Sequence, residues 1–136
     1  MSKIIKNQNS EHGGAGVKLM LVLVVLFSIA HAGYNYIPVA YEGENFKQDL
    51  QTAVVQAVAL PGANITMVDS AKHKVMMAAA NNNIPKNALI EVKQNGSVIQ
   101  AHVKYTKQVD ILPFGLYKYN YQFEKTATPT GFLFKE

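Results

Sequence analysis

The chain of 136 residues contains neither cysteine nor arginine, and each absence excludes a class of function. Without cysteine, the protein can form no disulfide framework and no thiolate metal site. Its 13 basic residues are all lysines, and they are scattered rather than clustered. The planar guanidinium group of arginine is the usual reader of guanine edges and phosphates, and scattered lysines offer no electrostatic footprint for a polyanion. We therefore expect no nucleic-acid partner.

Motifs for catalysis or metal binding are also missing. Four histidines occur, none at the spacing of a metal-binding helix: His12, His31, His73 and His102. The carboxylates are dispersed over different predicted elements and include Asp49, Asp69, Glu91, Asp110 and Glu124. There is no nucleophile elbow, phosphate-binding loop or dinucleotide fingerprint. We expect the histidines on the solvated surface, no catalytic, cofactor-binding or metal-binding residues, no cofactor and no enzyme activity.

The sequence has one long apolar run, Leu19–Ala30, which divides it into two unequal parts. The run has eleven uncharged residues up to Ile29, whereas a membrane-spanning helix needs about 20. Continuation through Tyr34 and Tyr36 to Ile37 would supply the length and place tyrosine rings at the headgroup level. This interpretation predicts a transmembrane helix over residues 17–36, after a flexible basic leader over residues 1–16.

A cleaved signal peptide is the alternative interpretation of the same segment. The leader is basic, the run has signal-peptide length, and Ala30-His31-Ala32 is a cleavage pattern before Gly33. Under both interpretations residues 37–136 form a small exported domain, because Glu42 and Glu44 follow the run. We expect a single-pass protein of the cytoplasmic (inner) membrane with a cytoplasmic N-terminus and an extracytoplasmic head, or a protein secreted after cleavage at Ala32-Gly33.

The first helix of the head is predicted over Glu44–Leu60. Pro38 marks a kink or a helix boundary before it, Asn45 caps its start with Gln48 as a partial capping box, and Pro61-Gly62 ends it. Its apolar residues recur at helical spacing and form one stripe: Phe46, Leu50, Ala53, Val54, Ala57 and Val58.

A second, shorter helix begins at a cap supplied by Asp69 or Ser70. Asn81-Asn82-Asn83 is suited to a left-handed stop, and Pro85 prevents continuation. One face of this helix is apolar: Ala71, Val75, Ala78 and Ala79.

After this helix the apolar period changes to two, which predicts three strands. Residues 88–94 and 97–111 form a hairpin around Asn95-Gly96 in a type I′ turn. The second strand buries alternate residues, interrupted only by Lys107: Ile99, Ala101, Val103, Tyr105, Val109 and Ile111. The predicted fold class is α+β: an N-terminal transmembrane helix, then two helices packed on a three-stranded antiparallel β-meander. The tail with Phe132, Leu133 and Phe134 has no period.

The third strand carries an aromatic stripe, which allows two interpretations: Tyr117, Tyr119, Tyr121 and Phe123. The rings could form a platform for a sugar or another flat ligand, or they could be the buried face of the sheet. Their alternation in register with the aliphatic face of the preceding strand favours burial. We therefore predict that Ile99, Val103 and Tyr105 on one strand and Tyr119 and Tyr121 on the next point to the same side. They should meet two helix faces: Phe46, Leu50, Val54 and Val58 of the first helix and Val75 and Ala79 of the second.

Three segments together carry a family resemblance: Tyr36-Ile37-Pro38-Val39-Ala40-Tyr41, the helix from Phe46 to Val58, and a meander with Val103-Lys104-Tyr105 and Pro113-Phe114-Gly115. This arrangement resembles an uncharacterised bacterial family of small single-pass membrane proteins, domain of unknown function 4845, over residues 15–125. The resemblance implies a retained anchor whose helix runs past Ala30-His31-Ala32 through Pro38. It implies no known activity and no functional residues.

The layout is also similar to a type IV pilin, with a basic leader, an apolar helix and an α-to-β-meander head. Leu21 occupies the position where a prepilin cut at Gly16-Val17 has glutamate, so the similarity concerns shape alone. The leading hypothesis is a non-enzymatic, membrane-anchored accessory or assembly protein whose pilin-like head contacts other proteins of the cell envelope. The alternative is a secreted or tethered ligand-binding module that uses the aromatic stripe; under the leading hypothesis we expect no small-molecule ligand.

Overall fold

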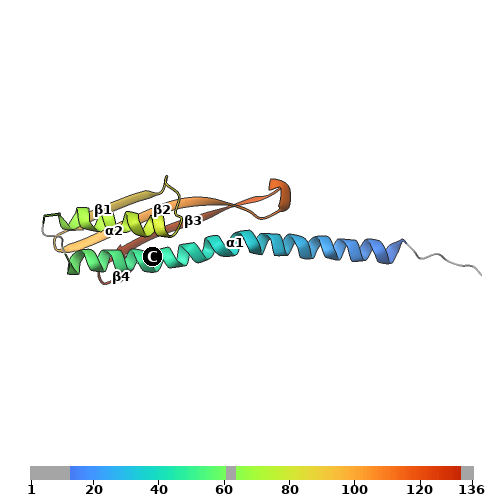
Figure 1. Ribbon diagram of the computed structural model, residues 1–136, viewed down its shortest axis with the longest axis horizontal. Coiled ribbons are helices and arrows are strands. Elements are labelled where there is room, and N and C mark those ends of the chain that lie inside the picture. Colours follow the sequence, from blue (N-terminus) through green and yellow to red (C-terminus); the bar gives the residue numbers. More distant parts are fainter. Residues whose placement is uncertain (1–12, 61–63, 133–136) are drawn as a thin grey trace, which may run out of the picture.

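The computed structural model describes residues 13–60 and 64–132 and shows the expected α+β layout (Figure 1). Helix α1 spans Gly14–Ala59 and helix α2 spans Met67–Asn81. Three long strands follow, β1 at Leu89–Asn95, β2 at Val98–Asp110 and β3 at Lys118–Thr128. A short 3-10 turn, η1, at Pro113–Gly115 joins β2 to β3, and a two-residue strand, β4, at Gly131–Phe132 adds a fourth strand to the predicted meander.

The apolar run and the first helix of the head form one continuous helix of 46 residues. The predicted boundary at Pro38 and the predicted cap at Asn45 are therefore wrong, and the helix passes the predicted anchor limits at both ends, starting at Gly14. Pro38 removes one hydrogen-bond donor and costs a helix interior about 3 kcal/mol. Contacts with the sheet on both sides of Pro38 outweigh this penalty, and the proline itself lies on the exposed side of α1.

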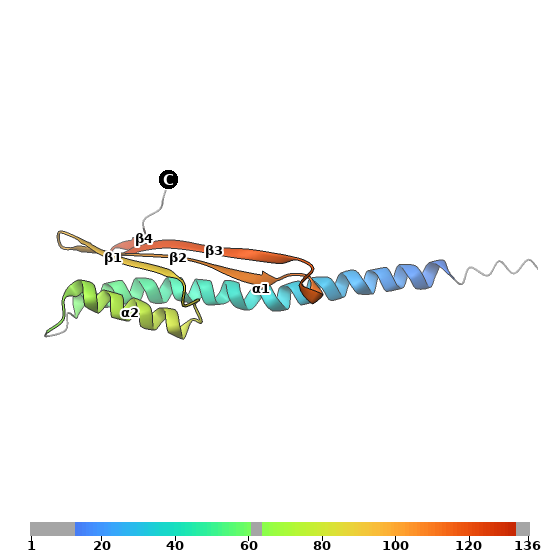
Figure 2. The ribbon, with the colours of Figure 1, turned by 90° about the horizontal axis from the view of Figure 1, so that it is seen from above.

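The second half of α1 and one face of α2 cover a single face of the sheet (Figure 2). Phe46, Leu50 and Val54 of α1 are fully buried, as are Val75 of α2 and Val103 of β2. The predicted stripe of α1 is confirmed, with Val58 at its end only partly buried, and all four predicted apolar positions of α2 are buried. Helical and strand periodicity thus identified which faces meet in the core.

The cap that begins α2 is Thr66, which corrects the prediction of Asp69 or Ser70. The Thr66 hydroxyl accepts from the backbone N–H of Asp69 at 3.2 Å and donates to the Asp69 carboxylate at 2.7 Å. The Thr66 hydroxyl therefore caps the helix and is itself held by the Asp69 carboxylate, which bonds the hydroxyl and not the Thr66 backbone N–H of a true capping box. At the other end, Asn83 has a φ of 53°, so the predicted left-handed stop is confirmed. Pro61 and Gly62 lie outside the described residues.

The β1–β2 hairpin turns one residue later than predicted. Asn95 pairs with Val98, so the turn residues are Gly96 and Ser97. Only Gly96 has a positive φ, 64°, which is the pattern of a type II′ turn and not of type I′. A one-residue shift of the turn moves each cross-strand partner by two positions, so every side chain keeps the face that alternation predicted.

The sheet narrows along α1. Strand β1 pairs with β2 only as far as Lys104, whereas β2 and β3 continue together to Asp110 and Lys118. The end of the β2–β3 hairpin is therefore a two-stranded ribbon, which lies beside α1 and extends toward its apolar half (Figures 1 and 2). In the C-terminal tail, Phe132 contributes backbone to β4, and Leu133 and Phe134 lie outside the described residues.

Candidate functional site

The apolar run of α1 is exposed along its length. Large apolar side chains from Val17 to Ile29 are 53–69% exposed, and no described part of the chain packs over this segment. The helix is long and apolar enough to cross a membrane, which makes it a candidate membrane span by length and composition; a signal sequence has the same properties. Removal of so much apolar surface from water is strongly favourable, so this segment needs a lipid or protein environment.

The β2–β3 ribbon is attached to α1 at the end of the apolar run. Asn35 donates from its side-chain amide to the carbonyl oxygen of Asp110 at 2.9 Å. A ring nitrogen of His31, Nδ1, lies 3.2 Å from the carbonyl oxygen of Ile111. His31 is therefore half-buried against the ribbon, which corrects the prediction that it is solvated. The spacing of four residues places His31 and Asn35 on one face of the helix, but it does not indicate which segment they contact.

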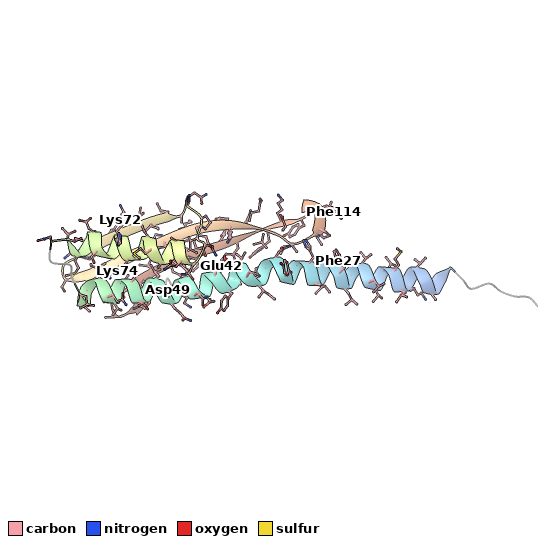
Figure 3. The ribbon with its side chains drawn as sticks, viewed as in Figure 1. Phe27, Glu42, Asp49, Lys72, Lys74 and Phe114 are labelled. Atoms are coloured by element: carbon pink, nitrogen blue, oxygen red, sulfur yellow. The ribbon has the colours of Figure 1, made fainter. Side chains whose placement is uncertain are left out.

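The turn that closes the ribbon presents two apolar side chains to the exterior. Phe114 is 97% exposed and Leu116 is 75% exposed. Phe114 also has a φ of 61°, a left-handed conformation that bulky residues rarely adopt, and it is followed by Gly115 with a φ of 68°. Figure 3 shows Phe114 at the end of the ribbon, close to the level of Phe27 on α1.

The aromatic stripe of β3 changes from buried to exposed along the strand. Phe123 is 5% exposed and packs on Phe46 of α1, with ring centroids 5.4 Å apart. Tyr121 is half-buried, and Tyr36 of α1 meets its ring edge-on at 6.3 Å. Tyr119, 43% exposed, also meets Tyr36, at 6.0 Å. The predicted burial is thus confirmed for the inner part of the stripe, while Tyr117 and much of Tyr119 remain outside.

Burial affects the titration of two tyrosines in this region. Desolvation raises the pKa of Tyr105 well above its ordinary value, and the neighbouring Tyr121 and Glu42 add to the rise. Desolvation also raises the pKa of Tyr121, with smaller contributions from Tyr36 and Glu44. Burial therefore makes ionisation of either hydroxyl less favourable than it is in water.

Lys107, the one interruption in the apolar face of β2, forms an ion pair with Glu42 of α1. Its ammonium nitrogen lies 2.7 Å from Oε2 of Glu42, and both side chains are only about a quarter exposed (29% and 24%). The other carboxylate oxygen of Glu42 accepts from the side-chain amide of Asn83, at 3.1 Å. One carboxylate therefore joins α1, the end of α2 and β2, and sequence reasoning missed this contact because the partners are 65 residues apart.

A cleft of about 510 Å³ lies along the middle of the ribbon, with Glu44 of α1 at its border. Its lining includes both signs of charge, and two of the charged groups form an ion pair: Lys104 lies 3.7 Å from Glu124. Glu124 is also 3.5 Å from His102, whose other ring nitrogen lies 2.8 Å from the Thr126 hydroxyl. These pairs cross-link the solvated face of β2 and β3.

The remaining predicted polar residues do not converge. His73 is exposed on α2, Asp49 accepts from the side chain of Asn82 at 2.7 Å, and His12 lies outside the described residues. Within residues 13–60 and 64–132, no three histidine or acidic side chains are grouped closely enough to hold a metal ion. The most distinctive surface of the molecule is therefore the junction between the apolar helix and the ribbon.

No family model matches the chain, and no curated protein or solved structure matches it either. The resemblance to the uncharacterised membrane family and to pilins therefore stays a prediction.

Proposed function

We propose that this protein is a non-enzymatic, single-pass membrane protein of the bacterial cell envelope. In this proposal, the N-terminus is cytoplasmic and the head is extracytoplasmic, where it acts as an accessory or assembly component that contacts other envelope proteins. The observation that carries the proposal is the continuity of α1, which runs unbroken from an exposed apolar segment into the core of the head.

The continuity of α1 favours a retained anchor over a cleaved signal peptide. The pattern Ala30-His31-Ala32 lies inside the helix, and His31 contacts the carbonyl of Ile111. Cleavage after Ala32 would remove one of the polar contacts that attach the ribbon to α1. The basic leader, with Lys3, Lys6 and Lys18 before the apolar run, supports a cytoplasmic N-terminus.

The burial of the aromatic stripe argues for a scaffold and against a ligand-binding platform. Phe123 is buried beneath α1 and Tyr121 is half-buried there. The ring of Tyr36 packs against both Tyr119 and Tyr121. A flat ligand would find Tyr117 accessible, but only parts of Tyr119 and Tyr121. Lys104 and Glu124 in the cleft form an ion pair, which favours a stable surface over a catalytic one.

Membrane extraction of the full chain tests the anchor. We expect the protein to stay with the membrane at alkaline pH and to keep its N-terminal residues. The double variant Leu23→Lys/Val24→Lys adds roughly 5–7 kcal/mol to insertion and should release the protein. The matched control, Gln48→Lys/Thr52→Lys on the exposed side of the same helix, should be retained. A soluble protein that starts at Gly33 would refute the anchor and favour secretion.

The partner is tested by cross-linking in cells, followed by affinity purification of the full chain from detergent-solubilised membranes. We expect defined envelope proteins that are absent when the Leu23→Lys/Val24→Lys variant is purified in the same way. Recovery of the chain alone would contradict a role in assembly.

A further inference from the structure

The apolar turn at the end of the β2–β3 ribbon has no contact within the described chain that accounts for it. Phe114, at 97% exposure, leaves nearly all of its ring in the open while holding a strained left-handed backbone. Strain of this kind costs of order 1–3 kcal/mol and is usually kept where it serves a function. Phe114 and Leu116 together form a small exposed apolar patch at the end of the ribbon.

The attachment of the ribbon to α1 sets the depth of this turn. A span of 20 residues, Val17–Tyr36, covers about 30 Å, the thickness of the hydrocarbon core. Asn35 and His31 then lie about 2 Å and 8 Å inside its outer boundary, at 1.5 Å per residue. Because these two side chains contact the carbonyls of Asp110 and Ile111, the ribbon reaches the same depth.

The chemistry around the turn matches the zone between hydrocarbon and water. Tyr34 is 81% exposed and Tyr117 is 55% exposed, and tyrosine rings are favoured at that level. The nearest charges, Lys118 and Asp110, form an ion pair of 3.8 Å at the base of the turn. They occupy the height where lipid headgroups and water begin.

Several backbone N–H groups around the turn are paired internally, which favours a medium that contains little water. The N–H groups of Ile111 and Leu112 both donate to the carbonyl oxygen of Tyr117, at 3.0 and 3.2 Å. The N–H of Leu116 donates to Pro113, and Pro113 itself has no N–H to satisfy. Internal pairing of this kind is what a lipid environment requires of a backbone.

We propose that the turn Pro113–Leu116 inserts Phe114 and Leu116 into the outer interface of the bilayer that α1 crosses. The occupant of this apolar surface is lipid. The head is then held to the membrane at two points, the helix and the turn, which fixes its rotation about α1. This inference rests on the proposed anchor, since the apolar run sets the depth of the turn.

The absence of tryptophan from the chain allows a direct test, because one introduced tryptophan is the only indole in the protein. The full chain is reconstituted in vesicles of phosphatidylethanolamine and phosphatidylglycerol that carry bromine atoms either near the headgroup or near the chain ends. Four single variants are compared: Phe114→Trp and Leu116→Trp at the turn, Phe27→Trp in the apolar run, and Ile65→Trp at an exposed site before α2. Leu116 has a relaxed φ of −62°, so it provides a second probe if Phe114→Trp perturbs the turn.

We expect blue-shifted emission for both turn variants, with strong quenching by bromine near the headgroup. The Ile65→Trp variant should emit at long wavelength without quenching. If the turn variants are unquenched while Phe27→Trp is quenched by deep bromine, the inference is wrong and the anchor stands. A blue shift without quenching would assign the turn to a protein contact and would also overturn the inference. If Phe27→Trp is itself unquenched, the proposed anchor fails and the inference fails with it.

Discussion

Gly43 lies on the buried side of α1 directly opposite Tyr121, and its replacement by alanine is a sharp test of how the helix meets the sheet. A Cβ at this position would clash with the Tyr121 hydroxyl and lie only 3.2 Å from Cζ of the ring. The ring cannot move freely, because Tyr36 and Tyr105 flank it, with centroids at 6.3 and 6.5 Å. The mutation therefore forces either the ring out of its site or the helix away from the strand.

Two opposing effects set the expected magnitude. Alanine favours the helix over glycine by about 1 kcal/mol. Overpacking of a filled site typically costs about 1–3 kcal/mol, and loss of two aromatic contacts adds about 0.5–1.5 kcal/mol each. We expect Gly43→Ala to lower the free energy of unfolding by about 1–5 kcal/mol, which is equivalent to a fall in Tm of at least about 4 °C for a domain of this size.

The assay is thermal unfolding of the full chain in detergent micelles, followed by the near-UV circular dichroism of tyrosine. The control is Gly33→Ala in the same helix, where the nearest atom to a new Cβ is Cδ1 of Ile37 at 3.8 Å; it should be neutral or slightly stabilising. The double variant Gly43→Ala/Tyr121→Phe lacks the clashing hydroxyl and should recover part of the loss. If Gly43→Ala is as stable as Gly33→Ala, the close approach of α1 and β3 is wrong.

Three further predictions follow from contacts described above. Glu42→Gln should destabilise the head by about 1–2 kcal/mol, because it leaves the half-buried Lys107 ammonium without its counter-charge. The double variant Glu42→Gln/Lys107→Met should restore part of that loss, whereas additive effects of the two substitutions would show that the pair is not coupled. Burial raises the pKa of Tyr105 above 10, so the Tyr105 hydroxyl loses its proton at a lower pH in the unfolded chain than in the folded protein. The contribution of the neutral Tyr105 to the free energy of unfolding is therefore complete below pH 10 and is lost as the pH rises above 10. Equilibrium unfolding between pH 9 and pH 12 should show a shallower decline for Tyr105→Phe, and parallel curves would contradict the assignment. Gly96→Val should lower the free energy of unfolding by about 1 kcal/mol or more, because Gly96 has a positive φ. In the same melting assay Asn95→Thr should be nearly neutral. Equal losses for the two variants would instead favour the type I′ turn.

Periodicity in the sequence was sufficient to predict the faces that form the core. Phe46, Leu50 and Val54 recur at helical spacing, and Ile99 and Val103 alternate along a strand, so each pattern identifies a buried face wherever the element lies. Alternation also predicted the face of each strand residue correctly, although the turn was predicted one residue too early. The left-handed stop within Asn81–Asn83 was equally local, because asparagine tolerates positive φ better than most residues.

The candidate site depended on tertiary structure, because its contacts join residues far apart in sequence. No local pattern predicts that His31 and Asn35 meet the end of β2, or that Glu42 neutralises Lys107. At Pro38 the local preference for a boundary was overridden by packing on both sides, which outweighs one missing hydrogen bond. The gradient of exposure from Phe123 to Tyr117 was likewise decided by where α1 passes over β3, since alternation specifies a face but not what covers it.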